Sequence, residues 1–163
     1  MDIGAHKGIY SKMLRKNFKR IISFEPFPTS FQPTYTCALS DREGTFPFYL
    51  NTGTGAADTL LPEFEYHLNT LPPQRFKGFD PIPVRVYRYD SLIKEKADLV
   101  KIDVEGSELA VIRGMKGWLP EKILVELHNI EWEKELLHLL MNYGYYVETV
   151  DDHPRFFARS LRR

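Results

Sequence analysis

The sequence has one cysteine, no long apolar run and no excess of charge of either sign. Cys37 is the single cysteine among 163 residues, which excludes an internal disulfide and a cysteine-rich zinc site. One free thiol is compatible with a reducing compartment, and we expect a cytoplasmic protein. No apolar stretch approaches the roughly 20 residues that cross a bilayer, so no membrane span is predicted.

The balance of charges limits the possible partners. Lys plus Arg number 22 and Asp plus Glu number 22, so the formal net charge is zero. Binding to nucleic acid without sequence preference depends on excess basic charge, and we therefore expect no nucleic-acid partner. A neutral chain does not repel its own copies, which makes a homo-oligomer possible. The length suits one domain over residues 1–163.

Segments with the apolar spacing of a helix alternate along the chain with segments that have the pattern of a strand. Tyr10, Met13, Leu14 and Phe18 have helical spacing, and further helical stripes follow Gly106 and Asn129. The predicted strands outside the hairpin insertion are 21–24, 35–39, 98–104, 123–128, 145–150 and 156–160. Strands that alternate with helices predict an α/β fold, with a mostly parallel sheet and helices on both faces.

A β-hairpin insertion is predicted over residues 46–89. Phe46, Phe48 and Leu50 alternate with other residues, and 84–89 alternates in the same way. The two segments can pair as a hairpin that carries a long loop over 52–83. A loop of that length in a compact domain is usually functional or disordered.

Ionisable residues follow several of the predicted strands. In a parallel sheet, ligands bind beyond the carboxyl ends of the strands, so we expect these side chains to gather along one edge. They are Asp2, Glu25, Asp103, Glu105, Glu126 and His128.

A glycine-containing turn opens the chain and leads into the first predicted helix. Gly4 and Gly8 would let the backbone approach a ligand, but their spacing differs from the dinucleotide fingerprint, which disfavours a nucleotide-binding oxidoreductase. Glu25 follows the next strand, where a carboxylate can accept hydrogen bonds from both hydroxyls of a ribose. The plainer alternative is a glycine turn with a surface glutamate.

Five short motifs occur in an order that is typical of one family. They are Asp-Ile-Gly-Ala-His-Lys-Gly at 2–8, Phe-Glu-Pro at 24–26, Ala-Leu-Ser-Asp at 38–41, Lys-Ile-Asp-Val-Glu-Gly-Ser-Glu at 101–108 and Val-Glu-Leu-His at 125–128. With these motifs, the chain resembles the FkbM-type methyltransferases over nearly its whole length. The resemblance implies a Rossmann-like class I methyltransferase fold. It also implies S-adenosylmethionine (SAM) as cofactor, and methyl transfer to a hydroxyl of a small-molecule or sugar-like acceptor.

The same resemblance implies roles for individual residues. The residues that match its cofactor-binding segments are Asp2, Gly4, Ala5, Gly8, Glu25, Ala38, Leu39, Ser40 and Asp103. The residues that would face the acceptor are Glu105, Glu126 and His128.

Removing the proton of a hydroxyl acceptor requires a base. His128 is the first candidate because its ordinary pKa is near neutral, and Glu105 is the second. The alternative for His128 is a structural hydrogen bond at a strand end. Asp103 and Glu105 could also bind a divalent ion, but the resemblance requires no metal and we expect none.

Two segments are shorter than in the family. Only Met1 precedes Asp2, where the family has a central strand, so the strands ending at Glu25 and Asp103 would lack a partner. Either the true start lies upstream, or the chain is a shortened product, or another segment fills the gap. Pro28 and Pro33 also exclude a regular helix over 26–37, which would open the adenine side. Both features favour an alternative, in which an inactive methyltransferase fold serves as a binding or assembly module.

Overall fold

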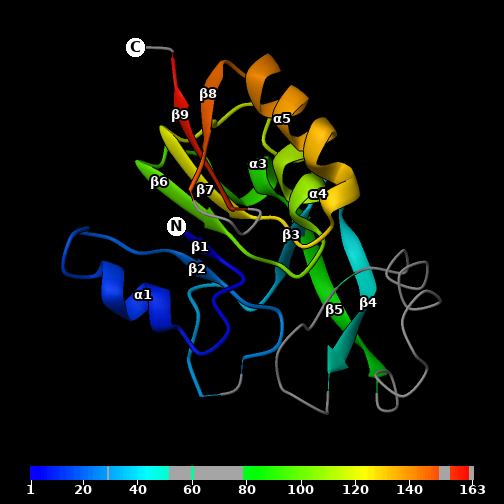
Figure 1. Ribbon diagram of the computed structural model, residues 1–163. Helices are drawn as coiled ribbons and strands as arrows, with labels where there is room; N and C mark the ends of the chain where they lie inside the picture. Colours follow the sequence, from blue (N-terminus) through cyan, green and yellow to red (C-terminus); the bar gives the residue numbers. More distant parts are fainter. Residues whose placement is uncertain (29, 52–59, 61–78, 151–154, 162–163) are drawn as a thin grey trace.

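The larger sheet of the computed structural model has six strands, counted over the residues that the structure describes: 1–28, 30–51, 60, 79–150 and 155–161 (Figure 1). Its order is β2-β1-β6-β7-β9-β8. The bounds are Asp2–Ile3 (β1), Ser23–Phe24 (β2), Leu99–Ile102 (β6), Lys122–Glu126 (β7), Tyr145–Thr149 (β8) and Arg155–Ser160 (β9). The first four strands in this order are parallel, and β9 and β8 are antiparallel additions at one edge. The predicted α/β fold with a mostly parallel sheet is confirmed.

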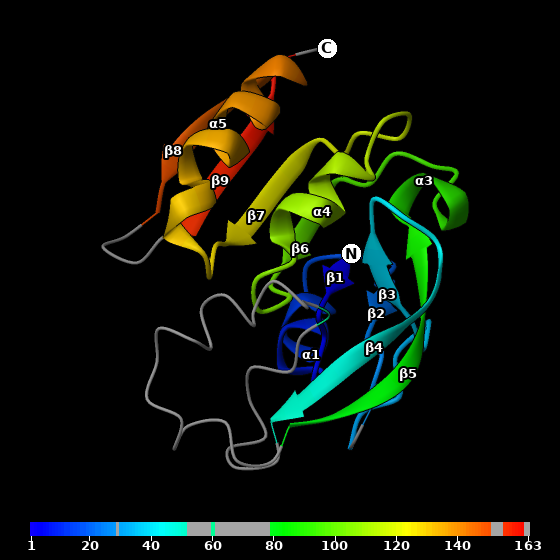
Figure 2. The same cartoon turned by 90° about the vertical axis from the view of Figure 1, so that its right-hand side faces the viewer.

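Helices cover both faces of this sheet. Their bounds are Ile9–Leu14 (α1), Tyr89–Leu92 (α3), Glu108–Arg113 (α4) and Glu133–Asn142 (α5), with a 3-10 turn at Ile130–Trp132 (η2). In Figures 1 and 2, α1 lies on one side of the sheet, and α4 and α5 lie on the other. Within the described ranges, no helix is long and apolar enough to cross a membrane.

The helices differ in how much apolar surface they bury. α5 packs Leu136 and Leu140 into the main core, where both are fully buried. α1 instead buries only Ser11, while Tyr10 and Met13 are exposed. The helical spacing at Tyr10 and Met13 correctly indicates a helix, but these side chains are not part of the core.

Among the described residues, the hairpin forms a second, three-stranded sheet in the order β3-β5-β4, seen in Figure 2. β4 (Gly44–Asn51) pairs antiparallel with β5 (Phe79–Arg88), and β3 (Ala38–Ser40) pairs parallel with β5. The predicted pairing of the two hairpin segments is therefore present, although Tyr89 begins α3 instead of ending the strand. Most of the predicted 52–83 loop lies outside the described residues, and the assignment of 1–163 to one domain stays a prediction.

The expected gap in the centre of the main sheet is filled by residues 2 and 3. Asp2 pairs with Ser23 on one side and with Lys101 on the other, and Ile3 continues both registers. The Asp103 N–H donates to the Ile3 carbonyl over 3.1 Å. β2 and β6 therefore have a strand partner at this level, and the expectation that they lack one is wrong.

The segment after β2 contains no helix among its described residues, 26–28 and 30–37, as the prolines predict. The chain instead returns so that the Tyr35 ring stacks on the Phe24 ring, with 5.1 Å between centroids. Phe24 and Tyr35 also form an isolated parallel bridge. This short return leads directly into β3.

Candidate functional site

A cavity of about 260 Å³ opens at the carboxyl ends of β1, β2 and β6 and extends to the hairpin sheet. Its wall includes many of the residues that the sequence suggested for the site: Gly4, Ala5, Glu25, Ala38, Leu39, Asp103 and Glu105. Phe48 and Leu60 add apolar surface from the insertion. Three of the six strand-end residues, Glu25, Asp103 and Glu105, therefore meet at this cavity.

Five of the suggested residues lie outside this wall: Asp2, Gly8, Ser40, Glu126 and His128. Asp2 is completely buried beneath it. Ser40 borders a separate, smaller hollow beside Asp41. The Glu126 carboxylate accepts a hydrogen bond from Arg155 Nε over 3.1 Å.

The two loop glycines are required by packing of the protein on itself. Gly4 has φ +77°, and a Cβ there would lie 1.8 Å from the Asp103 carbonyl oxygen. Gly8 has φ +70°, and a Cβ there would lie 2.3 Å from the Phe31 ring. Both positions need glycine for its conformation and for its lack of a side chain. The sequence predicts that a ligand approaches closely at these glycines, whereas the structure shows that close packing within the chain requires them.

The carboxylate of Glu25 is held rigidly on the cavity wall. The residue directly follows β2 and is 6% exposed. Its Oε2 accepts the His6 N–H at 2.8 Å, and its Oε1 accepts the Phe27 N–H at 3.0 Å. A carboxylate offers about four lone-pair sites in all, and these two N–H donors use one on each oxygen.

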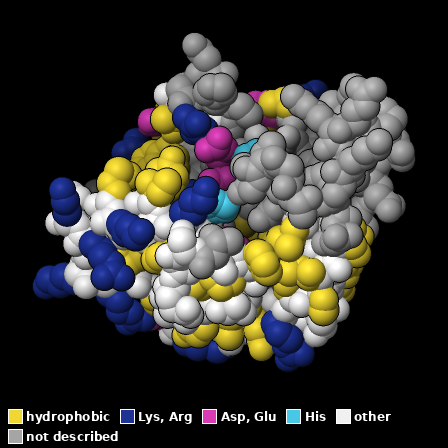
Figure 3. All heavy atoms as spheres, turned by 90° about the horizontal axis from the view of Figure 1, so that it is seen from below, with side chains coloured by type: hydrophobic (Ala, Val, Ile, Leu, Met, Phe, Trp, Pro, Cys, Tyr) yellow, Lys and Arg dark blue, Asp and Glu magenta, His cyan; other side chains and the backbone are white. Residues whose placement is uncertain are grey.

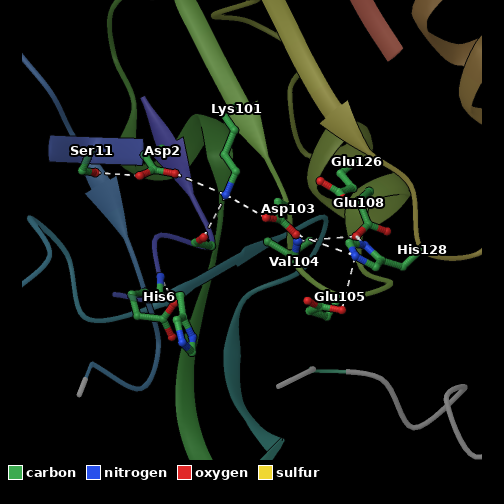
Figure 4. A network of polar contacts seen from close by, with 12 residues as sticks. Asp2, His6, Ser11, Lys101, Asp103, Val104, Glu105, Glu108, Glu126 and His128 are labelled. Carbon is green, nitrogen blue, oxygen red and sulfur yellow. Dashed lines mark hydrogen bonds and ion pairs between the residues drawn. The ribbon is translucent and has the colours of Figure 1, made fainter. Parts of the chain in front are cut away.

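Lys101 is a buried cation at the base of the site that the sequence analysis did not assign. Its Nζ lies 3.0 Å from Asp103 Oδ2, 3.5 Å from Asp2 Oδ1 and 3.1 Å from the Gly4 carbonyl oxygen (Figure 4). Ser11 completes the arrangement, because its hydroxyl donates to Asp2 Oδ2 at 2.6 Å. A signal was present in the sequence: Lys101 interrupts an apolar strand two residues before Asp103, which places both side chains on one face.

His128 is surrounded by carboxylates (Figure 4). Its Nδ1 lies 2.9 Å from Glu108 Oε1. On the other side of the ring, Nε2 lies 3.3 Å from Glu105 Oε2 and 3.8 Å from Asp103 Oδ1. Glu108, which the sequence analysis did not assign, is fully buried and also accepts the Gly106 N–H at 2.9 Å.

The charges around His128 change its chemistry. Burial alone would lower the pKa of His128, but the hydrogen bond and charge of Glu108, with the charges of Glu105 and Asp103, outweigh burial and raise the pKa to about 9. The imidazole is therefore a cation at neutral pH. The hypothesis that His128 is the first base assumed a near-neutral pKa, and that assumption is wrong.

Glu105 is a half-buried acid on the cavity wall with an unusual backbone. Burial raises its pKa, an effect that the positive charge of His128 partly offsets. Its φ is +52°, a conformation that non-glycine residues rarely adopt and that is often found at functional sites.

Two further features of the site concern metal binding and the reactivity of its cysteine. Ligand atoms of Asp103, Glu105 and His128 lie within 4.8 Å of one another, close enough to hold a divalent cation, a use that would require loss of the His128 proton. Cys37 also lines the cavity, but burial raises its thiol pKa to about 11, which makes it a poor nucleophile, as the sequence suggested.

Comparison with known proteins identifies the family. Residues 2–157 match the family described as the methyltransferase FkbM domain. The chain belongs to the FkbM methyltransferase family. The methyltransferase sdnD of Sordaria araneosa is 25% identical, in an alignment that covers 71% of this chain and 59% of sdnD. The resemblance inferred from the sequence motifs is thus confirmed.

A solved FkbM structure has the same fold. The FkbM methyltransferase from Methylobacillus flagellatus superposes with a TM-score of 0.56 at 16% identity, over 97% of this chain and 42% of that protein. The chain therefore spans about three fifths of sdnD and less than half of the crystallised protein. The Rossmann-like methyltransferase fold predicted from the sequence agrees with this likeness.

Replacing Lys101 by methionine should destabilise the fold strongly. The variant would leave the buried Asp2 carboxylate without a compensating charge, at an expected cost of about 3–5 kcal/mol in the free energy of unfolding. Urea denaturation would measure the loss. Lys122→Met is the matched control on a neighbouring strand, where the lysine is exposed, and should change stability by less than about 0.5 kcal/mol. Equal losses in the two variants would contradict the role of Lys101.

The His128 ring should titrate near pH 9. Glu108→Gln should lower that midpoint, because the Glu108 carboxylate raises the pKa of His128 more than any other group does. NMR of the ring protons would give the midpoint, with His128→Gln to identify the signal. Glu135→Gln, at an exposed ion pair with Arg113, is the control and should leave the midpoint unchanged.

The same pKa predicts how stability depends on pH. Because the pKa of His128 is higher in the folded chain than the ordinary value of 6.5, the histidine stabilises the fold fully below pH 6.5. This contribution is lost as the pH rises from 6.5 to about 9. The loss should be on the order of 2–3 kcal/mol in wild type and absent in His128→Gln. A His128 midpoint at or below 6.5, or identical pH dependence in both proteins, would contradict it.

Proposed function

We propose that this FkbM-family chain binds SAM in the cavity and transfers its methyl group to a hydroxyl of a small-molecule or sugar-like acceptor. The observation that carries the proposal is the Glu25 carboxylate. It is fixed by two backbone N–H groups on the cavity wall, at the end of the strand next to the loop after β1. A carboxylate at that position in a nucleotide-binding βαβ unit accepts the two hydroxyls of a ribose.

The rest of the wall suits the other parts of SAM. Leu39, Phe48 and Leu60 provide apolar surface on the hairpin side, which suits the faces of an adenine ring. Asp103 places a carboxylate on the opposite side, which suits a ligand with a sulfonium and an amino group. Asp2 and Gly8 would act indirectly, by supporting the loop from below.

SAM supplies an electrophilic methyl group, so the chain has to orient an acceptor oxygen and take its proton. We assign the base to Glu105, because this residue lines the cavity and burial raises its pKa toward the range in which a carboxylate accepts protons effectively. The His128 cation, 3.3 Å from Glu105 Oε2, would position that carboxylate. Holding the acceptor close to the methyl group would supply much of the remaining rate.

The alternative, an inactive fold used for binding or assembly, loses its main support. It depended on an empty centre of the sheet, and residues 2 and 3 occupy that position with partners on both sides. The short segment after β2 brings Cys37 and Ala38 to the cavity wall. Methyl transfer is therefore the function we favour.

Glu25→Gln should weaken binding of SAM and S-adenosylhomocysteine by at least about tenfold, because charged hydrogen bonds to the ribose are lost. Glu25→Ala should abolish binding. Calorimetry with S-adenosylhomocysteine and its 2′-deoxy analogue sharpens the test: wild type should prefer the ribose form, and Glu25→Gln should lose that preference. Glu121→Gln, at an exposed site, is the control. Equal affinity in wild type and Glu25→Gln would remove the ribose assignment.

Glu105→Gln should keep S-adenosylhomocysteine affinity and slow methyl transfer by about 10²–10⁴-fold, the usual contribution of a general base. Release of S-adenosylhomocysteine over a panel of sugars and phenols would measure turnover. In wild type, the rate should rise with pH through the raised pKa of Glu105, because the base must be ionised. The exposed Glu148→Gln serves as control. Wild-type turnover in Glu105→Gln would exclude Glu105 as the base.

A further inference from the structure

Positive charge is concentrated in one segment of this neutral chain. Residues 3–24 contain six of the 22 Lys and Arg residues and none of the 22 Asp and Glu residues. The six cations are all exposed: Lys7, Lys12, Arg15, Lys16, Lys19 and Arg20. Arg20 pairs with Glu95, whereas the other five form no ion pair with the described residues. This segment therefore carries uncompensated charge that the proposed reaction does not use.

The same segment exposes large apolar side chains. Ile9, Tyr10 and Met13 on α1 are 67%, 41% and 55% exposed. Ile9 and Met13 are four residues apart, so they lie on the same side of the helix, and Tyr10 lies one turn before Met13. We call these three residues, together with the five unpaired cations, the α1 surface.

The α1 surface continues into the mouth of the cavity. Lys7, Ile9 and Tyr10 belong to it and also line the cavity. In Figure 1, α1 projects at the left of the molecule. Figure 3, which keeps left and right unchanged, shows Lys and Arg side chains together with hydrophobic ones on that side.

We propose that the α1 surface docks on an anionic phospholipid bilayer. Charge complementarity identifies the occupant: cations with exposed apolar side chains on a projecting helix match a surface that is anionic at the headgroups and apolar beneath them. Ile9 and Met13 would enter the headgroup region while the lysines contact lipid phosphates. The cavity mouth would then lie against the membrane. This inference goes beyond methyl transfer and does not depend on which cofactor the cavity holds.

Sedimentation with vesicles tests the proposal on the whole chain. Wild type should bind vesicles of equal parts phosphatidylcholine and phosphatidylglycerol, and should not bind pure phosphatidylcholine. Salt at about 1 M, where the screening length is about 3 Å, should release it. The double variant Lys12→Glu/Met13→Ser avoids the cavity wall and should bind the anionic vesicles about tenfold more weakly or worse.

A matched control is available on the opposite side of the sheet. Lys134→Glu/Met141→Ser exchanges the same residue types on α5, where Met141 is 63% exposed, and should bind like wild type. Circular dichroism would verify that both variants fold. The proposal fails if wild type binds neither vesicle, which would point to a protein partner, or binds both equally, or if the two double variants bind equally well. Calorimetry with S-adenosylhomocysteine should be unchanged in both variants, so failure of docking and failure of methyl transfer are distinguishable.

Discussion

The buried ammonium group of Lys101 is the interaction on which the site depends. It lies between the Asp2 carboxylate of β1 and the Asp103 carboxylate that follows β6, and it also contacts the Gly4 carbonyl oxygen. One cation therefore ties a two-residue central strand, the loop after it and the neighbouring strand end into one unit. Because Gly4 packs directly on the Asp103 backbone, this unit forms part of the cavity wall.

Charges of opposite sign alternate from this point toward His128. After Lys101 and Asp103 comes the His128 cation, with Glu105 on one side and the buried Glu108 on the other. Each cation stabilises carboxylates that burial would otherwise penalise. Glu105 lines the cavity and burial raises its pKa, and these two observations support the proposal that it is the base.

The sequence predicted what depends on local pattern. The strand ends, the hairpin and the position of Glu25 followed from apolar periodicity and from motifs. The protonation state of His128 did not, because it depends on Glu108, which lies on another element twenty residues earlier. Helical spacing at Tyr10 and Met13 also could not distinguish a core face from an open one, since both give the same period. Residues 2 and 3 form a strand because they pair with β2 on one side and with β6 on the other. Two residues are too few to show a strand pattern in the sequence.

Cys37 gives the molecule a built-in reporter. It is the chain's one thiol, it lies in the cavity wall, and it is 3% exposed with a pKa of about 11. A thiol-specific reagent thus has one position to modify, and modification must await a transient opening that admits both reagent and solvent. The rate at which the Cys37 thiol is modified then reports how often the cavity opens, and a molecule that fills the cavity should slow the modification. The native sequence therefore allows opening of the site to be measured without an engineered label.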